Sequence, residues 1–180
     1  KVNYLVANNA INIYRQGGNT PGKITTTGYN NGGYGLSAGN GDLSIYGGTI
    51  EISGSTKGIF SSGGNITIAD CNITISDKGG FTAWANYWGG GDILINSGNI
   101  TITDGNIYAS KGDNDSGKGG NITINGGEIT VDGGKFWSEG GNITITDGTI
   151  TVEGYSGFES TGNVTINGGE ITATATGDYS

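Results

Sequence analysis

Histidine and methionine are absent from this 180-residue chain, and cysteine and proline occur once each. Without histidine there is neither a Ser-His triad nor a histidine-ligated metal site, and one cysteine excludes a thiolate zinc cluster and an internal disulfide. A glycosidase needs two facing carboxylates, and no such pair stands out among the acidic residues. We therefore expect that the protein is not an enzyme.

Charge is also scarce, because charged residues make up 13% of the chain, about half the usual share. There are 16 acidic and 8 basic residues and no basic run, so we expect no nucleic-acid partner. No window approaches the ~18 consecutive apolar residues of a transmembrane helix, so we expect no membrane insertion. The chain starts at Lys1 without an initiator Met or an apolar signal region, and we expect this N-terminus to result from processing or from the choice of segment.

Glycine and isoleucine dominate the composition instead. The chain has 39 glycines, and it has 24 isoleucines against four leucines. β-Branched isoleucine favours strands and leucine favours helices, so this ratio argues against a helical protein. So much glycine also fits a flexible, low-complexity chain, and the arrangement of the residues decides between the two.

The arrangement is periodic. The repeated unit reads Gly-Gly-Asn-Ile-Thr-Ile, then a glycine turn, then x-Ile-Thr-Ile or x-Ile-Thr-Val, and it is plainest over 134–156 and 157–175. Insertions at 84–90 and 111–118 widen two of the repeats. The Asn or Asp that opens the middle segment recurs at Asp42, Asn65, Asp92, Asn121, Asn142 and Asn163. Stacked at matching turns, these side chains are expected to hydrogen-bond to one another.

Each unit holds three short segments with alternating apolar and polar residues, and each is too short to bury an apolar face alone. Parallel stacking of the units buries all the isoleucines in one core. The pattern predicts an all-β, right-handed parallel β-helix with three short strands per turn and about seven turns. We expect one domain over 1–180, with a degenerate first turn over 1–33, regular turns over 34–175 and a tail over 176–180.

The alternation also assigns the faces of each strand. Isoleucines point inward on the second and third strands, and threonines form outward ladders there. Threonine is what a solvated β face prefers, although a flat threonine array is also compatible with ice binding. On the first strand the inward residues are Leu36, Ile59, Phe81, Ile107, Phe136 and Phe158.

The outward position of the first strand is unusual because it carries aromatic residues, and the insertion at 84–88 beside it adds more. Exposed aromatic rings stack on the C–H faces of sugars, and an aromatic stripe indicates a contact surface. The alternative is that the insertion folds back over this stripe as a small satellite core. The predicted contact face comprises Phe60, Trp84, Tyr87, Trp88, Tyr108 and Trp137.

Two further features are a second insertion and the lone cysteine. In the 111–118 insertion, Asp113, Asn114 and Asp115 could provide two or three of the six to eight oxygen ligands that calcium needs, although the same spacing is common in plain solvated loops. We take Asp113 and Asp115 as candidate ligands for Ca²⁺. Cys71 is expected to be a small buried residue at a turn, the alternative being a reactive thiol.

The repeat resembles a family of bacterial carbohydrate-binding β-helix domains with a pectate-lyase-like fold. The resemblance covers roughly 34–175 and rests mainly on 58–80, GIFSSGGNITIADCNITISDKGG, and on 118–175. It implies a secreted or cell-surface protein that binds plant polysaccharides such as pectin and cellulose and carries calcium. The family pattern D-G-I-[DH]-[AS] has an acidic or histidine residue after Gly-Ile, and of the matching positions here only Glu159 is acidic.

Two functions therefore remain. The first is a non-catalytic, extracellular polysaccharide-binding module that uses the aromatic face. The second is a structural subunit that stacks head to tail into an extracellular filament, because neither end of the chain has a clear polar cap to cover its strand edges. Ice binding is a distant third.

Overall fold

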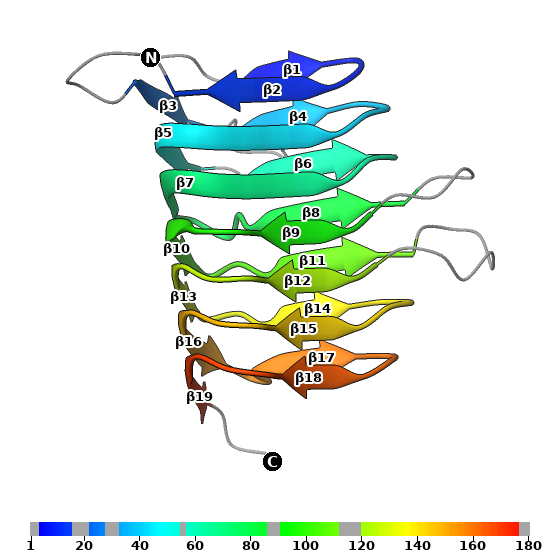
Figure 1. The fold of residues 1–180 in the computed structure, drawn as a ribbon. Coiled ribbons are helices and arrows are strands. Elements are labelled where there is room, and N and C mark those ends of the chain that lie inside the picture. Colours follow the sequence, from blue (N-terminus) through cyan, green and yellow to red (C-terminus); the bar gives the residue numbers. More distant parts are fainter. Residues whose placement is uncertain are drawn as a thin grey trace.

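The protein forms a parallel β-helix, as the repeat predicts. A computed structural model describes residues 4–15, 22–27, 33–54, 57–85, 91–111 and 120–176. Every regular element in these ranges is a β-strand, and every strand pairing is parallel. The turns stack along one axis from the N-terminal strands to the C-terminal strands (Figure 1). Within these ranges no helix is long and apolar enough to cross a membrane.

The first strand of each turn belongs to a seven-stranded sheet in the order β1-β4-β6-β8-β11-β14-β17. Its strands are β1 (Leu5–Ala7), β4 (Leu36–Ala38), β6 (Ile59–Ser62), β8 (Phe81–Trp84), β11 (Ile107–Ser110), β14 (Phe136–Ser138) and β17 (Phe158–Ser160). The pairing Phe60↔Thr82, Thr82↔Tyr108 and Tyr108↔Trp137 confirms the predicted outward column.

The second and third strands of the turns form one bent, twelve-stranded sheet. Its separate strands are β2 (Ile11–Tyr14), β3 (Lys23–Thr27), β9 (Ile93–Ile95), β10 (Gly98–Thr103), β12 (Ile122–Ile124), β13 (Glu128–Asp132), β15 (Ile143–Ile145), β16 (Thr149–Gly154), β18 (Val164–Ile166) and β19 (Glu170–Ala175). In two turns the second and third strands are continuous, as β5 (Leu43–Ser53) and β7 (Ile66–Ile75). Positive φ at Gly47, Gly48 and Asp70 makes the bend inside these two long strands.

The inward isoleucines form the predicted single core. Ile66, Ile93 and Ile122 occupy matching register positions and are at most 1% exposed. The third-strand isoleucines of β5, β7, β10, β13 and β16 are at most 2% exposed, whereas Ile24 and Ile171 in the end turns are partly buried. A register slip of one residue would turn each of these side chains to solvent, which is why the alternation alone was sufficient to fix the pairing.

Cys71 lies in this core at the corner between the second and third strands, where its register partners are glycines, Gly48 and Gly98. It is 2% exposed, as expected of a buried cysteine. Burial and the nearby Asp70 charge raise the pKa of its thiol to about 12, so the thiol is protonated and a poor nucleophile at neutral pH.

The Asn and Asp residues that open the second strands form a continuous hydrogen-bonded ladder. The side-chain oxygen of each residue accepts the backbone N–H of the equivalent residue one turn later; for example, Asn65 N–H donates to Asp42 Oδ1 at 2.7 Å and Asn163 N–H to Asn142 Oδ1 at 2.8 Å. The stacking was predicted, but most bonds run to the backbone, and only Asn121 Nδ2 also donates to a ladder side chain, Asp92 Oδ1 at 3.1 Å. The ladder satisfies backbone donors at a corner where the sheet hydrogen bonds are interrupted.

The two ends of the described β-helix differ in how well their cores are covered. In the N-terminal turn Ile11 is 7% exposed and Thr26 is 0% exposed, and Leu5 and Val6 are the exposed aliphatic residues. In the C-terminal turn Val164 and Ile166, inward residues of β18, are 44% and 51% exposed. The last described turn therefore presents open core and unpaired strand edges.

Thr26 is a weak point of the N-terminal turn. Its hydroxyl is buried and has no hydrogen-bond partner within the part of the chain that the structure describes. Replacing Thr26 by the isosteric valine should stabilise the protein by about 1 kcal/mol, because it removes an unsatisfied buried hydroxyl. The change is measured as a higher denaturant midpoint, with the outward-facing neighbour Thr25→Val as the control. A lower midpoint for Thr26→Val would contradict this assignment.

Candidate functional site

The candidate site is an aromatic strip, which we define as Trp84, Tyr108 and Trp137 on the outer face of the seven-stranded sheet. Tyr108 and Trp137 are register partners on β11 and β14, and Trp84 ends β8 one turn earlier. The rings of Tyr108 and Trp137 stack with centroids 4.4 Å apart and an interplanar angle of 22°. Trp84 meets Tyr108 edge-on, with centroids 6.5 Å apart and an angle of 87°. All three side chains are partly exposed.

Both faces of the Trp137 indole are already in contact with other groups. Tyr108, from the preceding turn, stacks on one face. On the other side, Lys135 Nζ lies 4.5 Å from the ring centroid and reaches toward Glu159 of the following turn, in a cation–π geometry. Trp137 therefore presents only its ring edge to a ligand. Trp84 is different, because its T-shaped contact with Tyr108 leaves at least one face of its indole without an aromatic partner among the described residues.

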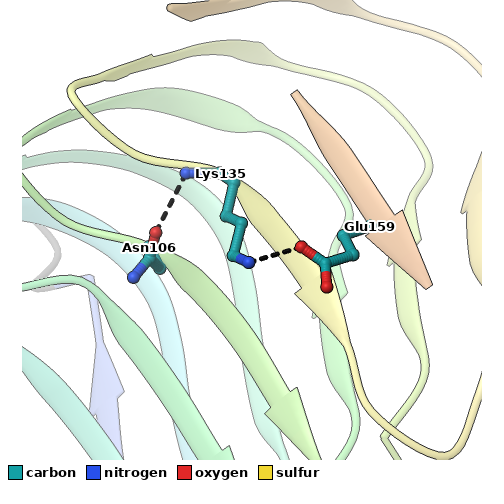
Figure 2. A network of polar contacts seen from close by, with 3 residues as sticks. All are labelled: Asn106, Lys135 and Glu159. Carbon is teal, nitrogen blue, oxygen red and sulfur yellow. Dashed lines mark hydrogen bonds and ion pairs between the residues drawn. The ribbon is translucent and has the colours of Figure 1, made fainter. Parts of the chain in front are cut away.

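A polar network of Asn106, Lys135 and Glu159 lies beside Trp137, over whose ring the Lys135 ammonium is placed; Figure 2 shows the network. The Lys135 ammonium forms an ion pair with the Glu159 carboxylate, and the backbone N–H of Lys135 donates to Asn106 Oδ1 at 3.0 Å. A small hollow of about 130 Å³ lies beside this network, lined in part by Asn106, Lys135 and Tyr155. Tyr155 is 65% exposed.

Glu139 borders the strip on another side, and it is coupled to Tyr108. The Tyr108 hydroxyl donates a hydrogen bond to Glu139 Oε2, and Ser110 Oγ donates to the same oxygen at 3.3 Å. Burial and this hydrogen bond raise the pKa of the Tyr108 phenol to about 12. The phenol is therefore a hydrogen-bond donor at neutral pH, and it fixes the position of the carboxylate.

This coupling predicts an alkaline pH dependence of stability. An unfolded tyrosine loses its proton near pH 10, whereas folded Tyr108 keeps it to about pH 12. The contribution of Tyr108 to the free energy of unfolding is therefore complete below pH 10 and is lost as the pH rises toward 12. Tyr108→Phe should therefore show a shallower loss of stability between pH 10 and 12 than the unmodified protein, in denaturant melts at each pH. The raised pKa of Cys71 adds the same pH dependence to both proteins, so it cancels in the comparison. Equal loss of unfolding free energy with pH in the two proteins would contradict the coupling of Tyr108 to Glu139.

Phe60 is not part of the exposed face, so its predicted place there is wrong. It occupies the predicted outward register position but is only 8% exposed. Tyr34 stacks on it at a centroid distance of 4.8 Å, and Lys57 Nζ lies 4.6 Å from its centroid. Tyr34 and Lys57 lie before the start of β4 and β6. The alternation of apolar and polar residues within the strands therefore does not predict that these two side chains bury Phe60.

The other predicted site residues lie outside the described residues: Tyr87 and Trp88 in 86–90, and Asp113 and Asp115 in 112–119. The described residues contain no group of three or more His, Cys, Asp or Glu side chains placed to hold a metal ion. Sequence reasoning did not single out Asn106, Lys135, Glu139 or Tyr155 as site residues, because each lies at a corner or in an irregular segment rather than in a strand.

Polar residues next to exposed aromatic rings match the chemistry of sugar recognition, in which rings contact C–H faces and charged or amide groups bind hydroxyls. No protein-family model, no curated protein and no solved structure matches the chain.

Proposed function

We propose that the protein is a non-catalytic, extracellular polysaccharide-binding module whose ligand runs along the aromatic strip. The observation that carries this proposal is the partly exposed Trp84. Its indole has an unstacked face among the described residues and contacts Tyr108, which is itself stacked on Trp137. The resemblance of the repeat to bacterial carbohydrate-binding β-helix domains supports the same ligand class.

The geometry also favours an extended ligand. Neighbouring strands of a sheet, and hence successive turns of this β-helix, are about 4.8 Å apart. This spacing is close to the length of one sugar in an extended glycan, so side chains on neighbouring turns can contact neighbouring sugars. Lys135 and Glu139 flank β14 in one turn beside the strip, and Glu159 lies in β17 of the next turn. These carboxylate oxygens and the ammonium group can bind hydroxyl groups of sugars further along a glycan whose first sugar contacts Trp84.

Affinity electrophoresis through gels that contain soluble cellulose derivative, xylan or pectin tests this function. We expect at least one of them to retard the protein, and Trp84→Ala to weaken that binding at least about fivefold, the effect of losing about 1 kcal/mol of aromatic contact. Trp137→Phe is the matched control, because it keeps a ring stacked on Tyr108. Absence of retardation in every gel, or a Trp84→Ala protein that migrates like its parent, would overturn the proposal.

A second candidate function is end-to-end association of copies through the C-terminal turn, supported by the exposure of Val164 and Ile166. The strand pairings place Glu170 of β19 in the same column as Lys23 of β3, six turns earlier. A second copy added in register would therefore set its Lys23 on Glu170 of the first. This heterologous contact does not close, so it would produce a filament.

Sedimentation velocity over a wide range of protein concentration tests this candidate. It predicts concentration-dependent growth that Glu170→Lys reduces and that a Lys23→Glu, Glu170→Lys charge swap restores. A monomer at every concentration would reject this candidate. Association that is unchanged by Glu170→Lys would also reject it.

A further inference from the structure

A second aromatic pair lies on the other sheet, at the N-terminal end of the β-helix. Tyr14 ends β2 and is the register partner of Tyr46 in β5. The two rings stack with centroids 5.4 Å apart and an angle of 14°, and they are 67% and 39% exposed. Tyr14 belongs to the first turn, so its outer face has no aromatic partner among the described residues.

Tyr14 also lines a groove that contains Arg15, the only arginine of the chain. The groove has a volume of about 350 Å³, within the range of small-molecule sites, and it is lined in part by Asn12, Tyr14, Arg15, Lys23 and Gly47. Its floor is a glycine corner. A Cβ at Gly47 would lie 2.7 Å from Arg15 Cβ, so the absence of a side chain there lets the Arg15 stem pack across the corner.

Arg15 is an exposed cation without a partner in the described part of the chain. The acidic residue near the groove, Glu51, is paired with Lys23 at 2.7 Å, and no described carboxylate forms an ion pair with Arg15. The chain has 16 acidic and 8 basic residues, yet the Arg15 guanidinium lies beside Tyr14 with no ion-pair partner among the described residues. A guanidinium binds a carboxylate through two parallel N–H donors.

We propose that this groove is a second saccharide subsite, selective for a sugar that carries a carboxylate. Tyr14 stacks on the sugar ring, the Arg15 guanidinium binds the carboxylate, and Asn12 is placed to bind a hydroxyl. This inference rests on the proposed polysaccharide-binding function for its ligand class. It uses a different sheet and different residues from the aromatic strip, so the two can be tested separately (Figure 1).

Isothermal titration with two matched probes isolates the carboxylate: cellotetraose, and the same tetrasaccharide oxidised to the carboxylate at C6. We expect the oxidised probe to bind at least about fivefold more tightly, with a preference that falls as salt rises. Arg15→Gln should abolish the preference, and Tyr14→Ala should weaken binding of the oxidised probe. Lys78→Gln, which removes an exposed cation elsewhere, is the charge-matched control and should keep the preference.

The outcomes separate this subsite from the aromatic strip. Equal affinity for the two probes, or a preference that survives Arg15→Gln, would overturn the subsite while leaving neutral binding at Trp84 intact. Binding of the oxidised probe that depends on Arg15, together with gel retardation that Trp84→Ala leaves unchanged, would support the subsite and contradict the proposed function of the strip. Amide resonances of residues 12–15 should shift with the oxidised probe, and shifts confined to the strip would count against the subsite.

Discussion

Gly134→Ala should destabilise the protein by about 3 to 5 kcal/mol, at the upper end of the range for single substitutions. A Cβ at this position would lie 1.8 Å from the carbonyl oxygen of Gly105 and 2.7 Å from its carbonyl carbon. The same column continues, since a Cβ at Gly105 would lie 1.7 Å from the carbonyl oxygen of Gly79. Backbone stacks on backbone at this corner, so the clash cannot be relieved by rotating a side chain.

Denaturant unfolding measures this loss, and Gly22→Ala is the matched control because nothing lies within 4 Å of its Cβ position. The control should change stability by no more than about 0.5 kcal/mol. Similar midpoints for Gly134→Ala and the unmodified protein would show that the turns are not stacked as closely as described.

Phe136→Ala should cost about 3 to 5 kcal/mol, because it removes a fully buried ring from the core. Phe136 stacks on Phe158 of the last turn, with centroids 5.0 Å apart and an angle of 20°. Phe158 is only partly buried, so Phe158→Ala should cost clearly less, about 1 to 2 kcal/mol. The comparison in parallel denaturant melts is decisive, because equal losses would contradict the open C-terminal turn.

The sequence was sufficient to predict the strand pairing, because alternation leaves one register that turns the isoleucines of every strand inward. The outward columns that contain Tyr108 and Trp137 followed directly from that register. The joined strands β5 and β7 did not follow, since the bend depends on backbone φ at Gly47, Gly48 and Asp70.

The chemistry of the candidate site was harder to predict than its position. The pattern placed Phe60 outward, but the cover that buries it comes from Tyr34 and Lys57, which precede their strands. The faces of Trp137 are occupied by Tyr108 and Lys135, which narrows the free stacking surface of the described strip to Trp84. These side-chain contacts depend on rotamers and on residues in neighbouring turns. The alternation of residues along a strand shows only which face a side chain is on, so it does not predict them.

The most direct test of the account follows the indole N–H resonances of the three tryptophans during titration with an oligosaccharide of whichever polysaccharide retards the protein. Each resonance is assigned by substituting one tryptophan with phenylalanine. We expect a large, saturable shift of the Trp84 indole resonance. The Trp137 indole resonance should shift less, because its ring faces are already in contact with Tyr108 and Lys135. No shift of the Trp84 indole at saturating oligosaccharide would contradict polysaccharide binding at the aromatic strip.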